Sequence, residues 1–169
     1  MKECWHHTKK SNFKFPFSIS DTVFVCVGTD RSTGDALGPM VGTKLIELGF
    51  KNVYGTLDEP VHALNLEDTI RVISKKHPQS KIIAVDACLG KSENIGMISL
   101  ADSPLKPGTG INKVLPSVGD YHLIGIVNVG GLMEYFVLKN TRLSLVVKMC
   151  DSIVEFLSKS LVDCADLAV

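Results

Sequence analysis

Runs of apolar residues alternate with amphipathic stretches along this chain. Short runs rich in β-branched residues predict strands at residues 22–28, 52–57, 81–85, 95–100 and 123–129. Apolar positions at helical spacing predict helices at residues 41–48, 66–73 and 143–161. Strands that alternate with helices in this way indicate right-handed βαβ units. The pattern therefore predicts an α/β fold, a three-layer sandwich with a mostly parallel twisted sheet and helices on both faces.

The first 20 residues show neither pattern, and we expect them to form an N-terminal arm before a single α/β domain at residues 21–169. This segment is basic but lacks the apolar core of a signal peptide. We expect it to be flexible. Its aromatic residues Phe13, Phe15 and Phe17 are candidates to dock on the domain or on a second subunit, which would make the protein a homo-oligomer.

Charge and cysteine content narrow the classes of partner. Eighteen basic and eighteen acidic side chains cancel, so the charge gives no basis for a nucleic-acid or membrane partner. No apolar run approaches the ~18 residues of a membrane span. The five cysteines are scattered and never form a CxxC arrangement, which is typical of reduced thiols in a cytoplasmic protein. We therefore expect a cytoplasmic protein that binds neither nucleic acid nor membrane.

Two aspartates follow the first and third predicted strands. Ligands of open α/β sheets bind outside the carboxyl ends of the strands, where the strand order reverses. If the first three strands take the usual 2-1-3 order, Asp35 and Asp86 lie together at that edge. Each residue alone has a simpler interpretation, because Asp35 could cap the following helix and Asp86 could sit in a solvated turn.

Paired carboxylates allow two kinds of chemistry. They can share one proton, so that one carboxylate activates a water molecule while the other donates a proton. Alternatively, they can hold a divalent metal, which is the one cofactor that the pattern leaves open. His62 follows the second strand and could reach the same cleft, whereas His122 is a candidate by residue type alone. Cys88 is a packing residue unless a neighbouring base makes it a nucleophile.

Glycine-rich segments flank this predicted site. The segment at residues 28–34 allows a tight connection from strand to helix, and it matches neither phosphate-binding glycine pattern. A second turn, with Gly108 and Gly110, is predicted to offer backbone N–H groups to a tetrahedral oxyanion.

Three segments bear a resemblance to the bacterial spore germination protease. Residues 33–39, TGDALGP, resemble its TPDALGP motif, and residues 84–87, AVDA, resemble its IDALA segment. Residues 102–112, DSPLKPGTGIN, resemble its SDTGIHPGSGVGN segment. The compact length and the start of the first motif look most like a small sporulation protein related to that protease. The resemblance implies a fold shared with hydrogenase maturation endopeptidases.

The resemblance also implies a function and its residues. Asp35 and Asp86 match the catalytic aspartates of the germination protease, so we expect an endopeptidase acting on a protein or peptide, such as a small acid-soluble spore protein. The late-strand segment of that family differs here, which leaves two alternatives: a catalytically silent protein-binding sporulation factor, or a metal-dependent maturation endopeptidase. The supporting residues expected around the pair are Gly28, Thr29, Gly34, His62, Gly108, Gly110 and Asn128.

Overall fold

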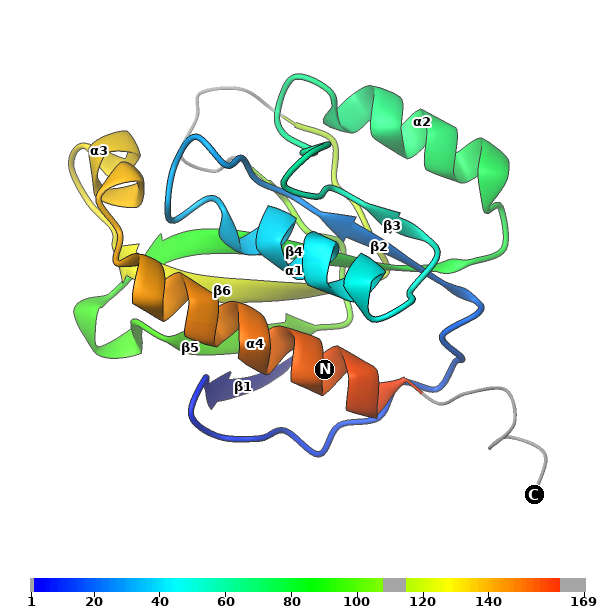
Figure 1. The fold of residues 1–169 in the computed structure, drawn as a ribbon, viewed down its shortest axis with the longest axis horizontal. Coiled ribbons are helices and arrows are strands. Elements are labelled where there is room, and N and C mark those ends of the chain that lie inside the picture. The colour runs from blue at the N-terminus through cyan, green and yellow to red at the C-terminus, as the bar shows by residue number, and fades with distance from the viewer. Residues whose placement is uncertain (1, 108–114, 162–169) are drawn as a thin grey trace.

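The computed structural model describes residues 2–107 and 115–161, and its strands form one six-stranded sheet (Figure 1). The strand order across the sheet is β1-β5-β6-β4-β2-β3. β2, β3, β4 and β6 run parallel, whereas β5 is antiparallel to both β6 and β1. The strands are β1 (Lys2–His6), β2 (Thr22–Cys26), β3 (Val53–Tyr54), β4 (Lys81–Gly90), β5 (Met97–Ala101) and β6 (Tyr121–Val129).

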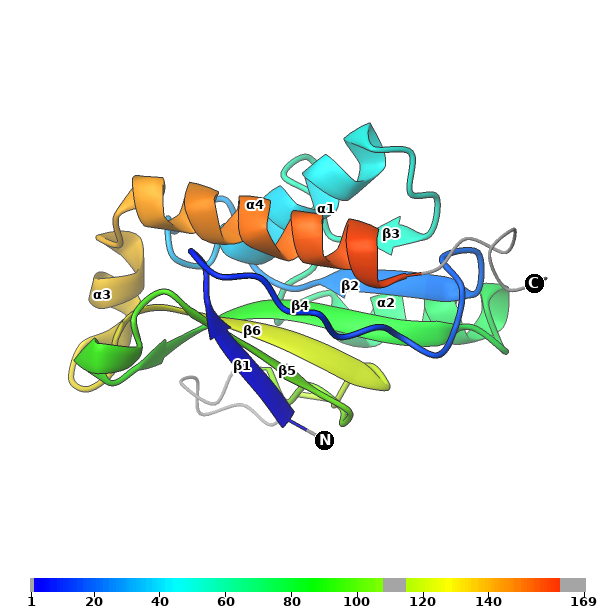
Figure 2. The ribbon, with the colours of Figure 1, turned by 90° about the horizontal axis from the view of Figure 1, so that it is seen from below.

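Helices cover both faces of the sheet, as predicted. α1 (Leu37–Glu47) and α4 (Leu143–Ser160) lie together on one face, which Figure 2 shows from the side. α2 (Leu66–Lys76) packs on the other face. The short helix α3 (Glu134–Lys139) and the 3-10 turn η1 (Ser92–Asn94) lie outside these layers. The three-layer α/β prediction is therefore confirmed.

β2 is buried on both faces and contributes side chains to the two hydrophobic cores, one on each side of the sheet. Phe24 and Cys26 point into the core beneath α1 and α4, and Val23 and Val25 point into the core beneath α2. A strand that is apolar at every position suits the middle of a parallel sheet, where neither face contacts water. β2 lies between β3 and β4, so the predicted 2-1-3 order of the first three strands is confirmed.

The N-terminal segment differs from the flexible arm that we expected. β1 pairs with β5 and extends the sheet. The Trp5 ring packs on Phe156 with centroids 4.8 Å apart, and Phe15 is only 2% exposed among the side chains of the main core. The Phe15 N–H donates to the Ser160 carbonyl at 2.9 Å. Burial of these large rings holds the segment in place, although its polar and charged positions resemble those of a solvated tail.

The ends of two strands also differ from the prediction. β4 continues past Asp86 to Gly90, because β6 offers pairing partners as far as Val129. The expected strand at residues 52–57 is reduced to Val53–Tyr54. In the described part of the chain, no helix combines the length and the apolar character needed to cross a membrane.

Candidate active site

Asp86 lies within β4, near the carboxyl edge of the sheet. Side chains alternate along a strand, so Asp86 shares the α2 face with Ala84, which is buried in the core beneath α2. Its Oδ1 accepts the N–H of Ala87 at 2.8 Å. Burial raises the pKa of Asp86 to about 8; the Ala87 N–H opposes this shift, and the charge of Asp35 adds to it. A carboxyl in this environment keeps its proton at neutral pH.

Asp35 closes the loop between β2 and α1. It does not cap the helix, because Ala36 occupies the N-cap position and no side chain bonds there. Burial raises the pKa of Asp35, and the hydroxyl of Ser32 opposes that shift. The Ser32 hydroxyl nevertheless falls short of hydrogen-bond geometry, since its buried oxygen has no hydrogen-bond partner among the described residues. Ser32 is a neighbour of Asp35 that the sequence analysis did not single out.

The backbone of the loop fixes Asp35 against the end of β2. Gly28 has φ +147°, and a side chain at this position would overlap the carbonyl oxygen of Asp35. The Gly28 N–H donates to the backbone carbonyl of Val61 at 2.8 Å, and the Thr29 N–H donates to the backbone carbonyl of Asp35 at 3.2 Å. Gly34 is packed against Leu138, whose carbonyl accepts the Gly34 N–H at 2.9 Å. These three predicted residues therefore position Asp35 through the backbone.

The two carboxyl groups are electrostatic neighbours. The charge of Asp35 contributes to the raised pKa of Asp86, and burial raises the pKa of both groups. Two carboxyls in this relation resist losing the second proton. At neutral pH Asp86 is a proton donor, and the neighbouring Asp35 is the candidate proton acceptor.

The two histidines lie on different elements. Val61 forms a parallel bridge with Val27, which brings His62 to the edge that carries the aspartates. The His62 ring contacts its own turn, because Nδ1 accepts the N–H of Leu64 at 3.3 Å. His122 pairs with Ala84 near the start of β6 and lies 2.7 Å from the Ser103 carbonyl through Nδ1. His122 therefore lies two residues before Ile124, the residue of β6 that pairs with Asp86, and on the same face of the sheet as Asp86.

Asn128 uses its polar atoms to hold α3. Its amide nitrogen donates to the Val137 carbonyl at 3.3 Å and to the Thr141 hydroxyl at 3.2 Å. Its amide oxygen accepts the N–H of Val129 at 2.8 Å. The structure thus gives Asn128 a supporting position beside the Asp35 loop, because Gly34 bonds to the same helix.

Other sequence candidates contribute less to this edge. Burial and the charge of Asp86 raise the pKa of Cys88 to about 11, so its thiol stays protonated at neutral pH and is a poor nucleophile. The predicted oxyanion turn at Gly108 and Gly110 lies outside the described residues. A metal would need further ligands from the chain, yet the described residues contain no group of three His, Cys, Asp or Glu side chains that could hold one.

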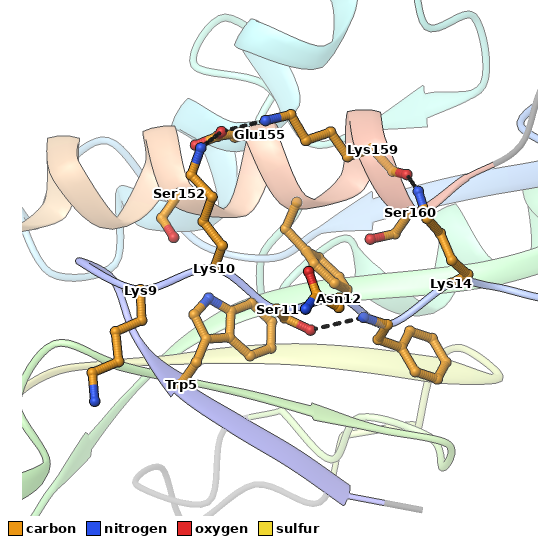
Figure 3. A pocket seen from close by; sticks show the side chains of 12 residues that line it. Trp5, Lys9, Lys10, Ser11, Asn12, Lys14, Ser152, Glu155, Lys159 and Ser160 are labelled. Atoms are coloured by element: carbon orange, nitrogen blue, oxygen red, sulfur yellow. Dashed lines mark hydrogen bonds and ion pairs between the residues drawn. The ribbon is translucent and has the colours of Figure 1, made fainter.

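A cavity of about 330 Å³ lies elsewhere, between the N-terminal segment and α4 (Figure 3). Its lining includes Lys9, Lys10, Lys14 and Lys159. Lys10 and Lys159 both form ion pairs with Glu155, and Lys14 donates to a backbone carbonyl. None of the predicted site residues lines this cavity. The candidate chemistry is therefore at the carboxyl edge.

Comparison with known proteins places this architecture among the hydrogenase maturation protease folds. The structure matches the crystal structure of a [NiFe] hydrogenase maturation protease, HycI from Thermococcus kodakarensis, with a TM-score of 0.57 and 17% sequence identity, over 83% of this chain and 91% of that chain. The chain belongs to the family described as "Protein of unknown function (DUF1256)", whose model matches residues 5–156. It is also 57% identical over 138 residues to the uncharacterized protein YyaC of Bacillus subtilis (strain 168), covering 80% of this chain and 67% of that protein.

YyaC is the protein that the compact length and the start of the first motif resemble, so this resemblance is confirmed. The match to the maturation protease confirms the expected fold.

Proposed function

We propose that this protein is an aspartate-dependent endopeptidase in which Asp35 and Asp86 activate water to hydrolyse a peptide bond. One observation carries the proposal: two neighbouring carboxyls at the carboxyl edge both have a raised pKa, and the pKa of Asp86 is about 8. Titratable groups with such shifts are typical of catalytic sites. The protease-like fold supports the same conclusion.

The two carboxyls take different roles at neutral pH. Asp86 holds a proton because its pKa is about 8, and we assign the role of general base to Asp35. Asp35 removes a proton from water as the water oxygen bonds to the carbonyl carbon, and Asp86 protonates the carbonyl oxygen. Asp35 then gives its proton to the leaving nitrogen as the C–N bond breaks, while Asp86 recovers a proton from the tetrahedral oxygen. Both residues return to their starting states.

The finer assignment is a sporulation enzyme of the germination protease type. The resemblance of three segments to that protease supports this proposal, and small acid-soluble spore proteins in the cytoplasm of the sporulating cell or spore are the natural substrates to test. No step in the proposed reaction uses a metal.

The direct test compares cleavage by the wild-type protein with cleavage by Asp35→Asn and Asp86→Asn, using a small acid-soluble spore protein and a broad peptide panel. We expect the wild type to cleave and both variants to lose at least about 100-fold in rate, the usual contribution of general acid–base catalysis. Asp58→Asn, at an exposed loop position, is the matched control and should cleave normally. Equal cleavage by all variants, or no cleavage of any substrate, would refute the proposal.

A second candidate is a protein-binding factor without turnover, which the large exposed apolar side chains of residues 132–136 favour. A pull-down that recovers one stoichiometric partner uncut, equally well with wild type and with Asp35→Asn, would support this alternative.

A further inference from the structure

The connection from β6 to α3 exposes several large apolar side chains. Leu132 is 94% exposed, Met133 and Tyr135 are each 72% exposed, and Phe136 is 58% exposed. We call residues 130–136 the apolar turn. Single exposed apolar residues are ordinary on a protein surface, but a run of this kind marks an interaction site.

The backbone holds the apolar turn in an unfavourable conformation. Met133 has φ +60°, and among the described residues it is the only non-glycine residue with positive φ. A side chain in this left-handed region is strained, so surrounding contacts must hold it there. The Val137 N–H donates to the Met133 carbonyl at 3.1 Å. The Gly130 N–H donates to the carbonyl of Gly90, the last residue of β4, at 2.7 Å. The exposed side chains are therefore presented from a fixed backbone.

Hydrogen bonds join the helix that follows the apolar turn, α3, to the loop that carries Asp35. The Gly34 N–H donates to the Leu138 carbonyl at 2.9 Å, and the Thr33 hydroxyl donates to the Lys139 carbonyl at 3.3 Å. Figure 1 shows α3 at the edge toward which β4 and β6 point. A peptide lying against the apolar turn would thus be adjacent to the loop that carries Asp35.

We propose that the apolar turn is the substrate-binding element of this site, and that it binds an extended peptide with bulky apolar side chains beside the scissile bond. This inference rests on the proposed endopeptidase function. The charge of the turn agrees with it, because residues 130–136 contain one acidic residue, Glu134, and no Lys, Arg or His. An acidic peptide would be repelled there, whereas a neutral apolar segment would cover surface that water now contacts.

The test measures peptide binding without turnover. Fluorescently labelled eight-residue peptides, with Leu or Phe at the central positions or Ser in their place, are titrated by anisotropy against the Asp86→Asn protein. In that background, the variants Leu132→Ala and Met133→Gly remove one apolar side chain each, and glycine tolerates the left-handed backbone. We expect the apolar peptides to bind about tenfold more weakly to each variant. Leu48→Ala, at a 60% exposed position at the far end of α1, should bind normally.

Cleavage by the same variants in the otherwise wild-type protein separates this inference from the proposed function. Weaker binding by the turn variants without any cleavage would support the apolar turn and refute the endopeptidase. Cleavage of apolar peptides with unchanged binding and rate in both turn variants would overturn the inference and leave the endopeptidase standing. Sedimentation supplies a further outcome, because a wild-type dimer that Leu132→Ala converts to monomer would show that a second copy, rather than a peptide, covers the turn.

Discussion

Replacing Asp86 by Asn should make the fold more stable, and the gain should grow with pH. The amide of Asn has nearly the shape of the carboxyl group and can still accept the Ala87 N–H that Asp86 Oδ1 accepts at 2.8 Å. The substitution removes only the ability to ionise. Because burial makes ionisation of Asp86 unfavourable in the folded protein, the variant avoids a cost that the wild type bears.

The magnitude follows from the shifted pKa. Raising the pKa of Asp86 from its ordinary 3.8 to about 8 makes ionisation in the fold less favourable by on the order of 5 kcal/mol. Between those two values the unfolded chain has lost the proton and the folded chain retains it, so the unfolded state binds fewer protons. The free energy of unfolding of the wild type must therefore fall as pH rises through this window. The Asn variant lacks this slope, and its advantage should increase by a few kcal/mol between pH 4 and pH 8.

Urea denaturation at pH 5, 6, 7 and 8 measures this difference. Trp5 is the only tryptophan of the chain and is 6% exposed against Phe156, so its fluorescence reports unfolding of the core. The difference between variant and wild type cancels the contributions of other titrating groups. Asp58→Asn is again the control, because it makes the same chemical change at an exposed position.

Two results would refute the reasoning about Asp86. A stability difference that stays constant from pH 5 to pH 8 would mean that the pKa of Asp86 is close to that of the unfolded chain. A wild type that gains stability over the Asn variant as pH rises would mean that the fold favours the ionised carboxylate, as a bound cation would require.

The remaining predictions concern the neighbours of the two carboxyls. Ser32→Ala should leave the urea midpoint nearly unchanged, because the lost hydroxyl has no hydrogen-bond partner in the described structure. Gly28→Ala should destabilise the protein by roughly 2–4 kcal/mol in urea denaturation, since its φ of +147° and the overlap with Asp35 both resist a side chain. Cys88→Ala should retain peptide cleavage within about twofold, because the wild-type thiol is protonated at neutral pH with a pKa of about 11. A loss of about 100-fold in the cleavage rate would instead indicate that Cys88 is the nucleophile.

The sequence predicts the sheet wherever a strand is apolar throughout. β2 could be recognised because every residue from Thr22 to Cys26 is buried, so its composition reflects the core directly. β1 could not, because only Trp5 of its five residues is buried and the other four read as a polar tail. α3 also escaped prediction, because none of its six residues is fully buried and its aromatic side chains, Tyr135 and Phe136, are exposed.

Strand ends were harder to predict than strand centres. Aspartate disfavours strands, and the pattern therefore ended the third strand at Asp86. The structure continues β4 to Gly90 because β6 supplies pairing partners, and pairing with a remote strand leaves no mark in the local sequence. Asp86 is consequently held by a rigid strand with apolar neighbours on either side, and this burial is the largest cause of its raised pKa.

The location of the candidate site follows from topology, but its chemistry depends on proton affinity. A divalent cation held between Asp35 and Asp86 would require both carboxylates to be ionised. At pH 7 such a cation would have to displace the proton of Asp86, whose pKa is about 8, and this displacement alone lowers the apparent affinity about tenfold. The described residues provide no third acidic, histidine or cysteine ligand to compensate for that loss. Activation of water in this way needs one protonated and one ionised carboxyl, and burial of Asp86 supplies the protonated one at neutral pH.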